Sequence, residues 1–269
     1  MKKGIRLFAT LMVCMAMALC VSCKKDNAEP NGGGNTGGGG NTGGGTGGEI
    51  SGCFSVSSTT TVEFSPGNLY WDGGAFRFEA DQWSSASTWD ASHVSHFFWS
   101  NTTDWQASGK EPYASSYSYS TRTTTDVFFT NSSSFQVAGE TAGTWRTLSK
   151  AEWDYLLNTR TNANNLHAWK ELDGGEHKGL VILPDGTDAS VMESITSTSH
   201  LATYSAVFLP AAGYRYGTVV YNVGSLGLYW SSTPYEDIED GAYVMYFDSG
   251  YASTSSGYRN FGYAVRLVR

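Results

Sequence analysis

A glycine-rich tract at residues 31–48 restricts where this chain can fold. It reads NGGGNTGGGGNTGGGTGG, with 12 glycines in 18 positions, so it has no large apolar side chains to bury and no preferred backbone conformation. We do not expect it to bind phosphate, because no Lys-Ser or Lys-Thr follows it. We expect residues 23–51 to form a flexible tether and residues 52–269 to form one folded domain.

The first 22 residues predict a signal peptide. Three basic residues precede an apolar run at residues 7–21, which is shorter than the roughly 20 residues that a membrane-spanning helix needs. The sequence CVSC at residues 20–23 resembles a bacterial lipobox, which implies a lipid on Cys23. The Lys-Lys-Asp that follows is similar to the charged tract of lipoproteins in the Bacteroides group. These resemblances imply an outer membrane lipoprotein, exposed at the cell surface and attached to the membrane only by its lipid.

The charge of the chain argues against two classes of partner. The formal net charge is -8 at pH 7, and removal of residues 1–22 would take away three cations and bring it near -11. An acidic surface repels phosphate backbones and anionic headgroups. We therefore expect no nucleic-acid partner and no peripheral membrane binding.

The cysteine content predicts a fold without disulfides. Cys14 and Cys20 lie in the predicted signal peptide and Cys23 in the lipobox, so Cys53 is the only cysteine in residues 52–269. We expect it to be a small buried hydrophobic residue rather than a nucleophile. Stability must then come from a hydrophobic core.

Short strands are expected over most of the domain. Residues 59–64 and 75–79 are rich in β-branched and aromatic side chains and flank Gly67 and the turn at residues 72–74, a pattern that predicts a hairpin. Residues 179–183 read GLVIL between two turn sequences, which predicts a short buried strand.

Two or three helices are predicted among these strands. Residues 149–160 begin with a capping box, in which Ser149 accepts a hydrogen bond from the third-position amide and Glu152 reaches back to the cap. The apolar residues of this segment fall on one face at helical spacing. Apolar residues also indicate helices at residues 87–98 and 188–195.

Several motifs carry a resemblance to known families. The sequence WRTLSKAEW at residues 145–153 and the ending GYAVRLV at residues 262–268 are similar to motifs of the sulfatase-modifying-factor group. Paralogous surface lipoproteins of the Bacteroides and Fibrobacter groups share a larger set, which here comprises VEFSPGNL (62–69), WRTL (145–148), VILP (181–184), AVFLPAAGYR (206–215), VGS (223–225), YWSST (229–233) and VRLV (265–268). The resemblance implies the α+β class, with a C-type-lectin-like fold of the sulfatase-modifying-factor type. It also places Trp145, Trp153 and Trp230 in the core.

No catalytic, metal-binding or cofactor-binding residues are predicted. Enzymes of the sulfatase-modifying group hold copper with cysteines late in the chain, and none follows Cys53. A Gly-x-Ser-x-Gly motif is missing as well. The acidic residues 236–240 match no calcium motif, so we expect a solvated loop, with a calcium site as the alternative. His93 and His96 lack a third zinc ligand and are expected to be isolated surface residues.

The C-terminal stretch from Tyr235 to Tyr263 is expected to bind a ligand. Tyr offers contact area at small entropic cost, and Ser and Gly offer adaptable hydrogen bonding. The alternation in residues 243–248 predicts a strand with one buried face and one available face. The predicted ligand-binding residues are Tyr235, Asp237, Tyr243, Tyr246, Asp248, Tyr251, Ser253, Ser255, Tyr258, Asn260 and Tyr263.

This stretch is also similar in layout to the variable regions of proteins that retroelements diversify. In those proteins, adenine-directed mutation of Asn codons randomises a ligand-facing surface. Glu236 and Glu239 cannot arise from an Asn codon in this way, so passive surface diversity is the alternative.

We interpret the chain as a cell-envelope lipoprotein whose non-catalytic domain binds an extracellular protein or glycan. One alternative is a structural envelope or fimbria-associated subunit that assembles with its own kind. Another is a degenerate or novel enzyme on the sulfatase-modifying scaffold, which would need a deep pocket with convergent titrating groups.

Overall fold

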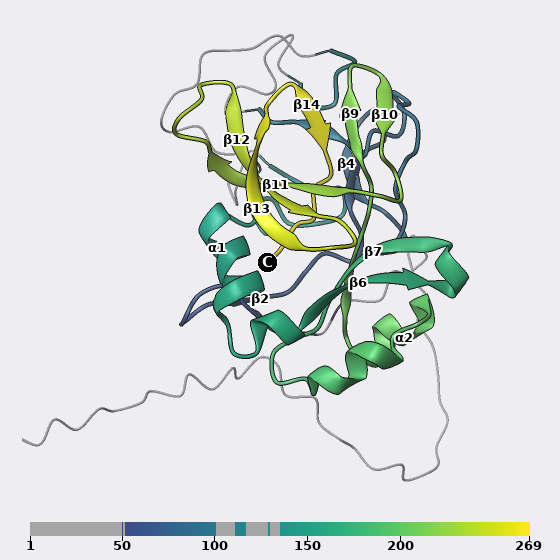
Figure 1. Cartoon of the computed structure of the whole chain (residues 1–269). Coiled ribbons are helices and arrows are strands. Elements are labelled where there is room, and N and C mark those ends of the chain that lie inside the picture. The colour runs from purple at the N-terminus through teal and green to yellow at the C-terminus, as the bar shows by residue number, and fades with distance from the viewer. Residues whose placement is uncertain (1–49, 51, 101–110, 117–128, 130–134) are drawn as a thin grey trace, which may run out of the picture. The chain divides into compact units, whose positions relative to one another are not determined.

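The computed structural model describes residues 50, 52–100, 111–116, 129 and 135–269 (Figure 1). All of them belong to one unit, Thr36–Arg269. A second unit, Met1–Asn35, lies outside the described residues, as do the predicted signal peptide, Cys23 and the glycine tract. In the described part of the chain, no helix has the length and hydropathy needed to cross a bilayer.

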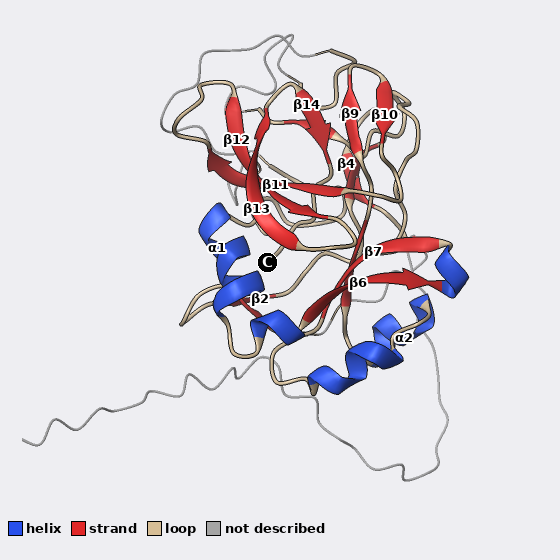
Figure 2. Ribbon diagram, viewed as in Figure 1, coloured by secondary structure: helices blue, strands red, loops and turns tan. Residues whose placement is uncertain are grey.

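The described residues fold mainly as β-structure, so the expected α+β class with two or three helices is wrong. Fourteen strands form five small sheets in this part of the chain. The longest helical segment has ten residues and consists of α1 (Lys150–Asp154) and the π-helix η1 (Tyr155–Thr159). Helix α2 (Thr198–Thr203) has six. Figure 2 shows strands and loops alone in the upper part of the view and the helices below them.

The strands β11 (Gly227–Pro234), β12 (Gly241–Phe247) and β13 (Ala252–Tyr258) form a meander with a hydrophobic cluster on each face. Tyr229 pairs with Met245, and both belong to one cluster; their neighbours Trp230 and Val244 pair and belong to another. The prediction of one buried and one available face for residues 243–248 is therefore wrong, because both faces are covered in the middle of β12. Strand β13 is the free edge of this sheet.

Four further sheets complete the described fold. Strands β6, β7 and β8 form one of them, and a third hydrophobic cluster includes Leu172, Val181 and Phe208 from these strands. The strands of the four sheets are β6 (His167–Leu172), β7 (His177–Ile182) and β8 (Val207–Pro210); β10 (Val219–Tyr221), β9 (Tyr214–Tyr216), β14 (Phe261–Tyr263) and β5 (Phe97–Phe98); β1 (Phe54–Ser55) and β2 (Thr61–Val62); and β3 (Leu69–Trp71) and β4 (Phe76–Phe78). The prediction of a buried strand at residues 179–183 is confirmed by β7.

Helix α1 begins with the predicted capping box. The Ser149 hydroxyl accepts from the amide of Glu152, and the Glu152 carboxylate accepts from the amide of Ser149. Arg146 donates to both carboxylate oxygens of Glu152, at 2.8 and 2.7 Å, which fixes the cap further. Trp153 is fully buried, and α1 lies beside the central meander. The predicted helix at residues 149–160 is thus confirmed, with a π-helical second half.

The motifs that carry the family resemblance meet in a buried hydrogen-bond network. Arg266 donates to the side-chain oxygen of Asn68 at 3.0 Å and to the carbonyl oxygen of Phe208 at 2.9 Å. The Asn68 amide donates to the Tyr229 hydroxyl, which donates to the carbonyl of Pro210. Because buried polar groups are costly when unpaired, a satisfied network of this kind joins four distant segments. These motifs therefore form the scaffold.

Several local predictions are corrected. Strand β2 pairs with β1, and β4 pairs with β3, so the hairpin predicted from residues 59–64 and 75–79 does not form. Residues 87–98 form turns and β5 rather than a helix, and residues 189–194 form a 3-10 helix. Cys53 is half-buried and disulfide-bonded, contrary to the expected absence of disulfides. Core positions are confirmed for the three motif tryptophans, Trp145, Trp153 and Trp230.

Candidate functional site

The structure divides the predicted ligand-binding residues among separate places. Tyr251 precedes β13 and Tyr258 ends it. At roughly 3.3 Å per residue, these two residues lie about 20 Å apart. Tyr243 and Tyr246 project to opposite faces of β12, because they are three positions apart and successive side chains alternate between the faces of a strand. The predicted set therefore does not form one surface.

Tyr235 and Tyr243 lie on the side of the meander that faces α1. Their rings are 5.0 Å apart and perpendicular, and the Tyr243 hydroxyl donates to Glu236 at 2.9 Å. The ammonium of Lys150 lies 5.6 Å from the Tyr243 ring. Burial, and next the hydrogen bond to Glu236, raises the pKa of Tyr243 to about 12. A hydrogen bond to Asp237 raises the pKa of Tyr235. These groups largely satisfy one another.

Tyr246 and Tyr251 lie together at the other end of the meander. Their rings are 5.3 Å apart, and the Tyr246 hydroxyl donates to Asp248 at 2.9 Å. Burial, and then this hydrogen bond, raises the pKa of Tyr246 to about 12. Ser253 and Ser255 pair with Tyr246 and its second neighbour Val244 and share their face of the sheet. Of the two rings, that of Tyr251 is the exposed one, at 60 %.

Two of the predicted ligand-binding residues are wholly or partly buried. Tyr263 is only 7 % exposed and its ring lies 4.3 Å from that of Trp230, so its assignment to ligand binding is wrong. Asn260 is half-buried, and its side-chain oxygen is buried without a hydrogen-bond partner among the described residues.

The largest group of exposed aromatic rings lies on one face of the β10–β9–β14 sheet. Tyr214 pairs with Tyr221, and Tyr216 pairs with Phe261, so these four rings project from the same face. Tyr258 at the end of β13 adjoins them, 6.3 Å from Phe261. The exposed fractions of Tyr216, Tyr221 and Tyr258 are 55 %, 42 % and 53 %. We call these five residues the aromatic surface.

Ring contacts make the aromatic surface continuous. Phe261 lies 5.6 Å from Tyr214 and 5.3 Å from Tyr216, and Tyr214 stacks on Tyr221 at 5.4 Å. Val219, which is 51 % exposed, pairs with Tyr216 on the same face. Isolated exposed apolar residues are common, but a contiguous group of this kind marks an interaction site more often than not.

A buried arginine holds this sheet to the rest of the domain. Arg215 projects from the opposite face of β9, and its guanidinium donates to the carbonyls of His96, Pro112, Ala114 and Gly217. It also lies 4.0 Å from the centre of the Phe98 ring. Burial lowers the pKa of Arg215 to about 9. The aromatic surface is therefore presented by a rigid support rather than by a loose loop.

An acidic loop borders the aromatic surface. Tyr258, Tyr235 and Ile238 line a hollow of about 110 Å³ between the end of β13 and the β11–β12 loop. Ile238 is 41 % exposed, and Glu236, Asp237 and Glu239 around it are exposed as well. In the described residues, no group of three His, Cys, Asp or Glu side chains is arranged to hold a metal ion.

Residues 185–268 are similar to a family described as a domain of unknown function, DUF8237. The chain matches no curated protein and no solved structure. The matched residues begin shortly after β7, end at Val268 and include every residue of the aromatic surface.

Sequence reasoning found only Tyr258 of the aromatic surface. The other four residues lie within or close to the motifs that carry the family resemblance, and these motifs form the scaffold in the structure. A usable signal was present, since Tyr214 and Tyr216 alternate with Arg215, and a strand with that alternation exposes one face. The burial of Arg215 between them was not predictable, because the carbonyl groups that it contacts come from distant segments of the chain.

The two histidines are not the isolated surface residues that were predicted. His96 is buried, and its Nε2 lies 2.8 Å from the carbonyl oxygen of Ala212. His93 is half-buried, and its Nε2 forms a hydrogen bond with the Glu79 carboxylate at 2.7 Å. Its ring stacks on Tyr70 at 4.2 Å.

Proposed function

We propose that this protein is a cell-envelope binding protein that recognises an extracellular protein or glycan through its aromatic surface. The observation that carries the proposal is the group of five contacting rings on one rigidly supported sheet face, three of them more than 40 % exposed. Tyr rings bury large areas at interfaces while their hydroxyls remain hydrogen-bonded, and they also stack on the apolar faces of sugars. The lipid on Cys23 and display at the outer surface are part of this proposal.

The charge around the aromatic surface favours a neutral or cationic ligand. The exposed carboxylates of Glu236, Asp237 and Glu239 lie next to the hollow that Tyr258 lines, and the whole chain has a net charge of -8. Such a border repels anionic partners and attracts basic ones. Recognition of nucleic acid or of an acidic polysaccharide is therefore not part of the proposal.

The experiment compares two matched variants of the full chain in a screen against glycans and extracellular host proteins. One variant carries Tyr216→Ser, Tyr221→Ser and Tyr258→Ser; the control carries Tyr251→Ser, at a residue that is 60 % exposed and lies at the far end of β13. We expect the triple variant to lose at least tenfold in affinity, because aromatic anchors dominate interfaces of this kind, and the control to bind as the parent does. Equal binding by the triple variant and the parent contradicts the proposal.

Light scattering on the same samples separates recognition from self-assembly. A monomer that binds a ligand agrees with the proposal. If the parent forms an ordered polymer and the triple variant does not, the aromatic surface would instead mediate assembly between copies of this chain, as in an envelope or fimbria-associated subunit.

A further inference from the structure

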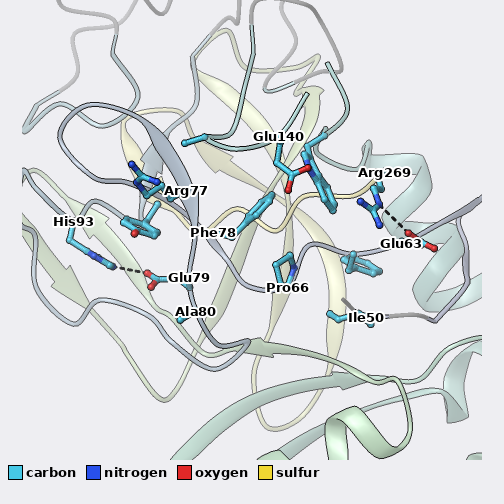
Figure 3. Close-up of a pocket in the computed structure, with 14 residues that line it drawn as sticks. Ile50, Glu63, Pro66, Arg77, Phe78, Glu79, Ala80, His93, Glu140 and Arg269 are labelled. Atoms are coloured by element: carbon cyan, nitrogen blue, oxygen red, sulfur yellow. Dashed lines mark hydrogen bonds and ion pairs between the residues drawn. The ribbon is translucent and has the colours of Figure 1, made fainter. Parts of the chain in front are cut away.

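A cleft of about 630 Å³ lies apart from the aromatic surface and shares no residue with it (Figure 3). Its walls come from strands β3 and β4 with the residues that follow them, from His93, from residues 138–145, from residues 63–66 and from Arg269. A volume of this size is typical of sites that hold a small organic ligand. The cleft also brings ionisable and aromatic side chains together, so its chemistry can be compared with that of possible ligands.

One end of the cleft holds an oriented imidazole. His93 Nε2 lies 2.7 Å from the carboxylate of Glu79, which is only 7 % exposed. The stacked ring of Tyr70 fixes the plane of the imidazole. Within the described residues, Nδ1 of His93 has no hydrogen-bond partner, so this end of the cleft has hydrogen-bonding capacity left for a ligand.

The other end holds an ion pair. Nε of Arg269 donates to the Glu63 carboxylate at 3.0 Å, and the guanidinium lies 5.1 Å from the Trp145 ring. Figure 3 shows this pair on one side of the cleft and the His93–Glu79 pair on the other. In the same view Glu140 lies above these two pairs and comes from a separate segment of the chain. Its carboxylate has no hydrogen-bond partner in the part of the chain that the structure describes.

Apolar side chains lie between the His93–Glu79 and Arg269–Glu63 pairs. Phe78 and Pro66 occupy the middle of the cleft in Figure 3. Phe78 is half-buried and contacts Trp145 edge to face, with ring centres 5.0 Å apart. The cleft therefore alternates along its length from a polar pair, to an apolar patch, to a second polar pair.

The arginines of the cleft already face carboxylates. Arg77 pairs with Asp72 and Arg269 with Glu63, and Glu79 and Glu140 place two more carboxylates in the cleft. An anionic ligand would therefore find neither arginine without a carboxylate partner. Carboxylate, imidazole and guanidinium groups in pairs still keep lone pairs and N–H groups that can bind neutral hydroxyls.

We propose that this cleft binds a short neutral oligosaccharide as a second ligand site. Hydroxyl groups bind to the His93–Glu79 and Arg269–Glu63 pairs and to Glu140, and the C–H face of a sugar ring lies on Phe78 and Pro66. The combination of planar hydrogen-bonding groups with an apolar patch fits a sugar, which has polar edges and apolar faces, better than it fits an ion or a purely apolar molecule.

The test is calorimetric titration of the purified full chain with maltotriose, cellotriose, mannotriose and triacetylchitotriose, and with trigalacturonate as the anionic counterpart. We expect at least one neutral trisaccharide to bind and trigalacturonate not to bind. Glu140→Gln should weaken binding roughly tenfold, because a charged acceptor for the sugar hydroxyls is replaced by a neutral and weaker one. Glu176→Gln is the control, since Glu176 is an exposed carboxylate that does not line the cleft.

One further variant keeps the test decisive. Phe78→Ser should abolish binding; if it fails to fold, Glu140→Gln still decides, because the Glu140 carboxylate has no hydrogen-bond partner among the described residues to lose, and the bonds of its backbone remain. Binding that is unchanged in Glu140→Gln, preference for trigalacturonate, or no binding of any neutral probe overturns the inference. Binding that falls only in the Tyr216, Tyr221 and Tyr258 triple variant also overturns it, while supporting the aromatic surface.

Discussion

The imidazole of His96 is fully buried and donates from Nε2 to the carbonyl oxygen of Ala212 at 2.8 Å. Burial lowers the pKa of His96 to about 4, because the charged form is not solvated there, and the cation of Arg215 lowers it further. The carbonyl acts in the opposite direction but does not compensate. His96 is therefore neutral in the folded protein at neutral pH, and its hydrogen bond joins β5 to the segment before β9.

This burial predicts that the protein loses stability as the pH falls from about 6.5 to about 4. In that range the unfolded chain binds a proton at His96 and the folded chain does not, so the free energy of unfolding should fall by about 3 kcal/mol from this residue alone. Urea titrations at several pH values measure the effect. His96→Gln keeps an amide donor and should show a flatter pH dependence; an equally steep curve would contradict the prediction.

Removal of Arg266 should destabilise the fold severely. Its guanidinium satisfies the carbonyls of Ser65, Gln82 and Phe208 as well as the side-chain oxygen of Asn68. Arg266→Met leaves these buried acceptors unpaired, and we expect a loss of about 3 kcal/mol or more in the free energy of unfolding. Thermal denaturation measures it.

Arg77→Met is the matched control for that variant. Arg77 is an exposed arginine whose partner, Asp72, lies at the surface as well. Its replacement should leave the unfolding temperature close to that of the parent. If both variants unfold at the same temperature, the buried network does not have the role assigned to it.

A methyl group at Gly227 should disrupt the central meander. A Cβ atom there would lie within 2.5 Å of three ring atoms of Phe247, so the Phe247 ring would have to leave the cluster that it shares with Tyr229. We expect Gly227→Ala to cost about 2 kcal/mol or more from overpacking. Gly74→Ala, which meets no atom closer than 3.7 Å, is the comparison. Similar unfolding midpoints for the two variants would refute this account.

Loss of the capping box should weaken α1. Ser149→Ala removes the acceptor for the amide of Glu152, and the expected cost is about 1 kcal/mol. Ser194→Ala, at an exposed serine, serves as the reference and should be neutral. Urea denaturation followed by tryptophan fluorescence reports the difference, since Trp153 lies in this helix.

Local signals predicted the helix at residues 149–160 and the strand at residues 179–183, because a capping box and an apolar run between turns act over a few residues. Pairing was not predictable in the same way. Strand β3 was not recognised, since three residues give almost no periodicity, and β4 was therefore assigned to the wrong partner. The class was wrong because it rested on a resemblance and on apolar spacing at residues 87–98, where tertiary contacts select turns and β5 instead.

The candidate site was predictable only in part. Composition indicated Tyr-rich contact surface near the end of the chain, and Tyr258 does belong to it. Tyr263 was predicted to be exposed but is buried, because strand register decides which face of a strand is covered and the local sequence does not reveal that register. The cleft could not be found from sequence, since its walls come from segments that are distant along the chain; Glu63 and Arg269, which pair at one end, are 206 residues apart.

Strand β13 is the free edge of the meander, and β12 lies between it and β11. Its exposed positions Ser255, Ser256 and Tyr258 belong to none of the three hydrophobic clusters. This edge therefore suits combinatorial randomisation: a library built at these positions would retain a folded framework while sampling new specificities, much as a loop does in an engineered scaffold.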